Sequence, residues 1–263
     1  MLEAGGEVVL DGSITYDDRV DIVITKSVTL DLNGCTVTES YGGINHFMMV
    51  IKDGGLLTLK DSKGGGKLCA TDSSYGYGIQ LFSNSKFIMT GGTIETTQES
   101  VDIYTSATNV TIDISGGNIV SSDDNVLGIR GDKTIAVNIT GGILTSNGRT
   151  SIYASSYTEN AISFNMTGGR IEHHGGMSGA IQIYSGANVL IDGSAEITTS
   201  DDGCIQLQAG AAPSSLLIKG GTLTADGWGK SSITTVDNAP VVIEGGTIIS
   251  KQGPLSVLRR ILL

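Results

Sequence analysis

The chain has 263 residues, of which 39% are hydrophobic and 16% charged, a balance that predicts an ordered protein with a substantial core. Only 5% of the residues are aromatic while 38 are glycine, so the core must consist of small layers of Val, Ile and Leu. With 16 Lys and Arg against 27 Asp and Glu, the net charge of −11 has the wrong sign for holding a phosphate backbone, and we expect no nucleic-acid partner.

The N-terminal residues "MLEAGGEVVL" lack the basic start and long apolar stretch of a signal peptide. The longest apolar run, near "HFMMVI", is too short to cross a bilayer, so we expect no membrane insertion. Cys35, Cys69 and Cys204 are far apart and show no CxxC spacing, which favours small buried thiols over metal ligands.

One phrase recurs along the chain. Loose copies come first, "VVLDGSI" (8–14), "LDLNGCTV" (30–37) and "LTLKDSKGGGKL" (57–68), and regular copies follow from "FIMTGGTIETT" (87–97) to "VVIEGGTIIS" (241–250). The first glycine of the regular copies stands at 91, 116, 141, 168, 193, 220 and 245, so successive spacings are 25, 25, 27, 25, 27 and 25 residues. This series predicts about ten structural repeats.

Within each repeat the apolar residues alternate with a period of two and are interrupted by Gly, Ser, Asn and Asp, which predicts three short strands and three turns. Identical copies in one phase bury their inward side chains by stacking on one another. We therefore predict an all-β protein, a right-handed parallel β-helix of about ten coils with about 25 residues per coil. The glycine pair is expected at a corner that needs positive φ or a tight backbone path.

We assign residues 1–263 to a single domain. Within it, 1–70 form less regular coils, 71–250 form regular repeats, and 251–263 form a last partial coil or a cap. An uncapped apolar end would expose strand edges, and we would then expect either a further downstream region or end-to-end self-association.

The phrases "AGGEVVLDGSI", "SVTLDLNGCTVT" and "GGLLTLKDSKGGGKL" resemble the opening coils of the pectate-lyase-like parallel β-helix superfamily, in particular its bacterial secreted and cell-surface members. The resemblance covers nearly the whole chain and implies the fold. It does not select a function, because the superfamily includes polysaccharide lyases and hydrolases, adhesins, tailspikes and passive stalks.

The common phase of the repeats places acidic residues in equivalent turns. If the residues that follow the glycines are aligned (Ile94, Ile119, Ile143, Ile171, Ile197 and Leu223), then Glu99, Asp124 and Asp202 fall at the same turn position. Glu99 and Asp124 belong to adjacent coils, about 5 Å apart if stacking is straight, which is the carboxylate separation of a retaining glycosidase. The alternative interpretation is a solvated turn that collects Asp and Asn for local hydrogen bonds.

A second acidic candidate is Asp201 with Asp202, one coil beyond His174, where an imidazole beside carboxylates suits general acid catalysis. The stretch "DDGCIQL" is similar to the "DDCI" strand entry of polygalacturonases, which implies a paired-aspartate role for Asp201 and Asp202. Gly203 interrupts that likeness, and the accompanying Asn-x-Asp, Gly-His-Gly and Arg-x-Lys motifs are missing. His173 and His174 are otherwise expected to form a polar turn.

No cofactor is expected, and no metal site is assigned. Calcium is the alternative, because lyase chemistry requires carboxylates that converge from neighbouring coils together with a base. Asp123, Asp124, Asp132 and Arg130 come nearest to such a set, but they match neither the nonapeptide calcium-binding roll nor the EF-hand loop.

Planar amides, phenols and charged groups recur on the outward side of the first strand of each repeat, where they suit sugar hydroxyls and ring faces or a protein epitope. The expected ligand-binding residues on this row are Gln80, Tyr104, Arg130, Tyr153, Gln182 and Gln206. Trp228, the sole tryptophan, is expected either as an exposed stacking platform or as a partly buried corner residue.

From these patterns we expect a secreted or cell-surface bacterial module that is not an enzyme and binds glycan, or another host or bacterial surface component, along its side. The alternatives are a polysaccharide hydrolase or lyase that uses the acidic turns, and a passive stalk or self-assembling rod. A cleft built by long loops would favour the enzyme, and a flat uncovered sheet would favour binding.

Overall fold

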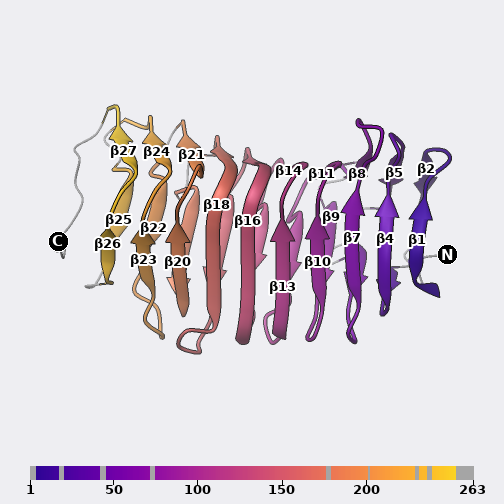
Figure 1. Ribbon diagram of the computed structural model, residues 1–263, viewed down its shortest axis with the longest axis horizontal. Helices are drawn as coiled ribbons and strands as arrows, with labels where there is room; N and C mark the ends of the chain where they lie inside the picture. Colours follow the sequence, from indigo (N-terminus) through magenta and orange to yellow (C-terminus); the bar gives the residue numbers. More distant parts are fainter. Residues whose placement is uncertain are drawn as a thin grey trace.

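The computed structural model describes residues 4–17, 21–41, 46–71, 75–175, 179–200, 202–228, 231–235 and 239–252. These residues form 27 strands and no α-helix, and all strand pairs are parallel. The strands stack side by side into a rod with the first coil at one end and the last at the other (Figure 1). No helix long and apolar enough to span a membrane occurs in this part of the chain.

The strands form three ladders, each with one strand from every coil. Ladder I comprises β1 (Gly6–Val9), β4 (Ser27–Asp31), β7 (Leu56–Lys60), β10 (Lys86–Met89), β13 (Thr108–Ile114), the first parts of β16 (Lys133–Ser146) and β18 (Ile162–His173), β20 (Ala187–Ile191), β23 (Ser215–Ile218) and β26 (Val241–Ile243). Ladder II comprises β2 (Ile14–Tyr16), β5 (Thr36–Glu39), β8 (Lys67–Ala70), β11 (Thr93–Thr96), β14 (Asn118–Ser121), the second parts of β16 and β18, β21 (Glu196–Thr199), β24 (Thr222–Ala225) and β27 (Thr247–Ser250).

Ladder III is a separate sheet of nine strands. It comprises β3 (Ile22–Ile24), β6 (Phe47–Ile51), β9 (Tyr77–Leu81), β12 (Val101–Ile103), β15 (Leu127–Ile129), β17 (Ile152–Ser155), β19 (Ile181–Ser185), β22 (Ile205–Leu207) and β25 (Ile233–Thr235). Nine complete coils and a partial tenth are thus described, which confirms the predicted parallel solenoid with three strands per coil. The right-handed sense stays a prediction.

The core is one continuous cluster of inward apolar side chains, from Leu10 to Val241. In ladder III, for example, Ile79, Val101, Leu127 and Ile152 are in register on successive coils, and all are fully buried. Each such side chain contributes roughly 1.5–3 kcal/mol through burial, so the stack stabilises neighbouring coils mutually. The alternation that predicted strands in the sequence is therefore the alternation of core and surface.

The glycine pairs form the corner between ladders I and II, and both members are needed. The second glycine has positive φ, for example 85° at Gly117 and at Gly142. The first approaches the preceding coil closely, since a Cβ on Gly141 would lie 2.3 Å from the carbonyl oxygen of Ser115. The expectation of positive φ or a tight path is confirmed in both respects.

The corner between ladders II and III holds an inward row of small polar side chains. Thr96, Ser121 and Ser146 are buried and in register on successive coils. The hydroxyls of Thr96 and Ser121 both donate to the carbonyl oxygen of Gln98 at 2.8 Å. These bonds satisfy turn carbonyls and so fix the backbone of the acidic turns that follow.

Two predictions about this region are wrong. Leu144, not Ile143, is in register with Ile119, because the 25-residue step between the glycine pairs carries Ile119 to Leu144 and Asn118 to Ile143. Ile143 consequently points outward and is 40% exposed. His173 is not part of a polar turn: it ends β18, in register with Ser146, and its side chain is fully buried, while His174 is exposed.

All three cysteines are free. Cys204 is the small buried thiol that we expected, and burial raises its pKa to about 12. Cys35 and Cys69 are only half-buried. The terminal segment 253–263, predicted as a last strand or cap, lies outside the described residues.

Candidate functional site

The predicted outward row exists on ladder III. Gln80, Asp102, Gly128 and Tyr153 occupy one register on successive coils, and Gln182 and Gln206 continue it. Tyr153, Gln182 and Gln206 alternate with buried neighbours and are half-exposed. The row therefore presents a phenol and two amides to solvent along successive coils.

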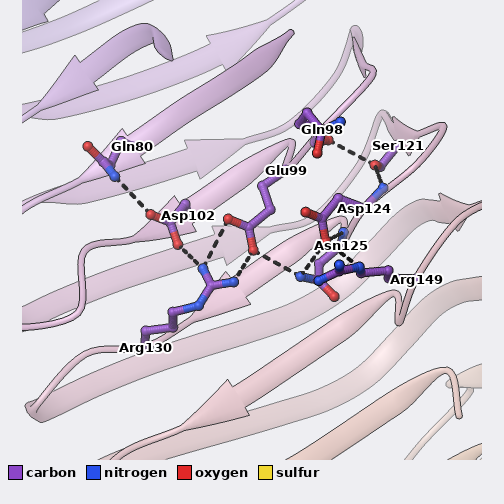
Figure 2. A network of polar contacts seen from close by, with 9 residues as sticks. All are labelled: Gln80, Gln98, Glu99, Asp102, Ser121, Asp124, Asn125, Arg130 and Arg149. Carbon is purple, nitrogen blue, oxygen red and sulfur yellow. Dashed lines mark hydrogen bonds and ion pairs between the residues drawn. The ribbon is translucent and has the colours of Figure 1, made fainter. Parts of the chain in front are cut away.

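At the start of this row, Arg130 joins two carboxylates from the coil before it (Figure 2). Its Nη1 donates to Asp102 Oδ1 at 2.5 Å and to Glu99 Oε2 at 3.0 Å, and its Nη2 donates to Glu99 Oε1. Gln80 Nε2 donates to the other oxygen of Asp102 at 2.9 Å. Glu99 and Asp102 are both buried, so the guanidinium offsets part of the charge of carboxylates that water reaches only slightly.

Gly128 creates the space for this network. It lies in β15 directly beside Asp102. At the same register position, each of the other coils from the fourth to the eighth carries a side chain. A Cβ at Gly128 would lie 2.5 Å from Arg130 Nη1 and 2.6 Å from Glu99 Oε1. The guanidinium thus occupies the space that a side chain at position 128 would otherwise fill.

The charges of the cluster shift its protonation equilibria. Burial, and then the charge of Glu99, raise the pKa of Asp102 to about 6 against the opposing effect of Arg130. Burial of Arg130 favours its neutral form, but hydrogen bonds and charges from Glu99 and Asp102 outweigh this effect and raise the pKa of the guanidinium. The arginine is therefore permanently charged, and Asp102 is the member that takes up a proton in mild acid.

The predicted pair Glu99 and Asp124 belongs to the same network. Asn125 Nδ2 donates to Glu99 Oε1 and to Asp124 Oδ1, each at 2.9 Å, so the two carboxylates flank one amide. Burial, followed by the charge of Glu99, raises the pKa of Asp124. Arg149 lies 4.0 Å from Asp124 and is largely exposed. Because Glu99 is buried and bonded to Arg130 and Asn125, the geometry describes a structural ion cluster better than an attacking carboxylate.

Aromatic side chains surround the row at one edge of ladder III. The rings of Phe82 and Tyr104 stack across adjacent coils with centroids 4.7 Å apart, and Tyr104 is 43% exposed. The Arg130 guanidinium lies 5.4 Å from the ring centroid of Tyr153. Tyr184 and Tyr157 are also exposed large side chains. Two predicted binding residues, Arg130 and Tyr153, are thus in contact.

A cavity of about 180 Å³ opens next to this contact. It lies where β12, β15 and β17 end, and its lining consists of Thr105, Arg130, Gly131, Asp132, Tyr153, Ser155, Ser156 and Tyr157. The hydroxyl of Thr158 donates to Asp132 Oδ1 at 2.9 Å and holds that carboxylate at the rim. The cavity thus combines two phenol rings, hydroxyls, one carboxylate and the edge of a guanidinium.

The second acidic candidate is described only in part. Asp201 lies outside the described residues. Asp202 Oδ1 accepts the backbone N–H of Gly203 at 2.8 Å, and its carbonyl oxygen accepts the hydroxyl of Thr199. The backbone N–H of Ser200 donates to His173, which places His174 opposite Ser200 on the adjacent coil. A catalytic role for Asp201, Asp202 and His174 stays a prediction.

Trp228 is 85% exposed, which corresponds to the platform alternative rather than to a partly buried corner residue. Within the described ranges, no group of three or more His, Cys, Asp or Glu side chains is arranged to hold a metal ion. Asp123 is exposed, and Asp132 faces the cavity rather than the Asp124 turn. The calcium alternative therefore has no described ligand set.

Sequence reasoning missed three contributors to the site: Asn125, which bridges Glu99 and Asp124, Gly128, and Tyr157 on the cavity wall. A signal for Gly128 existed, because a glycine stands where the repeat otherwise places an outward side chain, and glycine inside a strand often marks a close approach. Tyr157 lies beyond the strand, in a turn whose course the repeat does not specify.

The protein was compared with family models, with curated proteins and with solved structures. None of these comparisons found a match. The parallel β-solenoid is therefore established by the fold of the chain itself, without assignment to a named family.

Proposed function

We propose that this protein is a non-catalytic binding module of a bacterial surface or secreted protein, and that it holds a polysaccharide along the outer face of ladder III. The pectate-lyase-like resemblance of its opening coils is consistent with this role. The observation that carries the proposal is the half-exposed row Tyr153, Gln182 and Gln206, which continues the cavity beside Arg130.

The chemistry of this face suits sugars. Amide side chains both donate and accept hydrogen bonds, as sugar hydroxyls require, and phenol rings offer apolar faces to pyranose rings. Adjacent strands lie about 4.8 Å apart, so equivalent side chains recur at a short regular step along the rod. A repeating polymer can therefore make the same contact on successive coils.

The carboxylates of the site favour binding over hydrolysis. A retaining or inverting glycosidase needs one acid and one nucleophile or base that both reach the substrate. Glu99 and Asp102 are buried and hydrogen-bonded to Arg130, so they hold Arg130 in place and do not themselves face the ligand. Catalysis at the Asp201–Asp202 turn is the competing proposal, and a passive rod is the third.

A panel of neutral and acidic polysaccharides tests these proposals when retention and product release are measured on the same samples. We expect retention without product release, and we expect the double variant Gln182→Ala/Gln206→Ala to weaken retention at least about tenfold. The matched control is Asn138→Ala/Asn165→Ala, which removes a pair of outward amides that are in register on ladder I.

Product release that is lost in Asp201→Asn/Asp202→Asn would establish the enzyme instead. If neither retention nor product release is observed, the passive rod is the remaining proposal. Concentration-dependent filaments detected by light scattering would then identify end-to-end self-association. Immunodetection on intact cells of the source bacterium tests the proposed surface location separately.

A further inference from the structure

The cavity beside Arg130 differs from the rest of the ladder III face because it is concave and because its one cationic side chain is already paired with carboxylates. A volume of about 180 Å³ is below the roughly 300–1,000 Å³ of pockets that enclose a drug-sized ligand. It corresponds to roughly six water molecules at about 30 Å³ each. This space suits one ring of a longer chain rather than a whole independent ligand.

Arg130 is the only cationic side chain among the lining residues, and its charge is compensated. It makes three hydrogen bonds to Glu99 and Asp102, two carboxylates for one guanidinium. An arginine has five N–H donors, so these bonds leave donors for uncharged hydroxyls. An incoming carboxylate would instead compete with two buried carboxylates that already hold the cation.

The remaining charges repel an anion further. Asp132 contributes an exposed carboxylate to the lining, and Asp124 lies in the same network as Glu99. Counting Arg130 and Arg149 against Glu99, Asp102, Asp124 and Asp132, the charged groups at and behind the cavity sum to −2 when all are ionised. The chain as a whole carries −11.

We propose that this cavity binds one uncharged sugar unit of a polysaccharide and discriminates against uronic acids. The ring of that unit packs against Tyr157, while its hydroxyls bond to the free N–H groups of Arg130 and to the rim oxygen of Asp132. This inference rests on the proposed glycan-binding function and narrows its substrate class. It differs from what the resemblance to enzymes of acidic pectic polymers would imply.

Polyuronans and their carboxyl-reduced forms are matched probes, because reduction converts the carboxylate into a hydroxymethyl group and keeps ring and linkage. Binding of fluorescent oligomers of several such pairs would be measured on the full chain by anisotropy. Where a pair binds, we expect the reduced form to bind at least about tenfold more tightly at low salt, and the ratio to shrink at high salt.

Two substitutions locate the effect. Tyr157→Ala should lower affinity for the reduced oligomers roughly five- to tenfold, because it removes an exposed ring from the cavity wall. Asp132→Asn should narrow the difference between the reduced and acidic forms. Tyr75→Ala is the matched control, since Tyr75 is an exposed tyrosine that precedes β9 and does not line the cavity.

Tighter binding of the acidic forms overturns the cavity inference and leaves the glycan-binding function intact. The same holds if Tyr157→Ala has no effect while Gln182→Ala/Gln206→Ala abolishes binding. Binding of neither form in any pair, nor of any polysaccharide in the wider panel, overturns both.

Discussion

Two clusters of ionisable side chains lie on different coils of the same rod and differ in the basic residue at their centre. In the middle coils, Arg130 lies between Glu99 and Asp102. In the first coils, His46 lies between Asp21 and Glu39, with Nδ1 3.0 Å from Asp21 Oδ1 and Nε2 2.8 Å from Glu39 Oε1. In each cluster, one basic side chain contacts two acidic side chains.

The two basic side chains differ in their chemistry. A guanidinium keeps its charge at any physiological pH, whereas an imidazole donates from both nitrogens only while it holds two protons. Glu39 is almost fully buried, and burial followed by the charge of Asp21 raises its pKa to about 7. The first cluster therefore contains a buried carboxyl group that keeps its proton to a higher pH than usual, whereas the second is built around a guanidinium that stays charged.

The surroundings of the first cluster increase this dependence on pH. Tyr16 is in register with Glu39, and its hydroxyl donates to the carbonyl oxygen of Met48 at 3.3 Å. Burial, and then the charges of Glu39 and Asp21, raise the pKa of Tyr16, so the phenol supplies no compensating charge. The ring of Tyr41 packs edge-on against His46 at 5.2 Å.

The largest effect is expected for Arg130→Met, which leaves Glu99 and Asp102 buried without a cation. Removing one partner of a buried ion pair costs about 3–5 kcal/mol. Urea unfolding should show this loss in the free energy of unfolding at pH 7. Arg149→Met is the matched control and should cost less than about 0.5 kcal/mol, because Arg149 is exposed and 4.0 Å from Asp124. Equal losses in both variants would contradict the assigned role of Arg130.

The pH dependence of the first cluster is expected to be next in size. Because the pKa of Glu39 is raised in the folded state, its contribution to stability is fully present below its usual pKa near 4.5 and is lost as pH rises through about 7. The loss is on the order of 3 kcal/mol between those limits. Hydrogen-exchange protection factors, which are corrected for the intrinsic pH dependence of amide exchange, should therefore be lower in β2, β5 and β6 at pH 8 than at pH 5.

The variant Glu39→Gln sharpens this test. It removes the titrating carboxyl group, so the protection factors in β5 and β6 should become nearly independent of pH. A pH dependence that survives in Glu39→Gln would place the titrating group elsewhere.

A smaller effect is expected for Gly128→Ala. The new Cβ would meet Arg130 and Glu99 at 2.5–2.6 Å and displace the guanidinium, at a cost of roughly 1–3 kcal/mol. Gly12→Ala is the control, since a Cβ there meets nothing within 4 Å and the residue is not among those with positive φ. Thermal unfolding of both variants measures the difference, and equal midpoints would show that the network tolerates the methyl group.

The smallest change in stability is expected for Asp102→Asn, which leaves one carboxylate for one guanidinium. The free energy of unfolding at pH 5 should change by less than about 1.5 kcal/mol, because the amide keeps an acceptor toward Arg130. The proton uptake of Asp102 near pH 6 should disappear from the difference titration of the variant and the parent protein. An unchanged titration would assign that proton to another member of the cluster.

The two clusters also show how far the repeat could guide prediction. The phase of the glycines placed Glu99 and Asp124 in adjacent equivalent turns, and Asn125 indeed bridges them. The phase also placed Tyr153, Gln182 and Gln206 in one outward row, which the strand register confirms. The alignment at Ile143 was wrong by one residue: the 25-residue step from Gly116 to Gly141 carries Ile119 to Leu144, which is buried, whereas Ile143 is exposed.

Sequence alone determined the solenoid, its period, its core stripe and the outward row, because each of these follows from a local alternation that is copied in phase from coil to coil. Only the tertiary structure decided which charged groups meet. Arg130 and Glu99 are 31 residues apart, on non-equivalent positions of successive coils, and Glu39 and His46 come from different sides of a corner. Long side chains can contact residues that are not their partners in the strand register. Which residues they contact therefore depends on the space that residues such as Gly128 leave open.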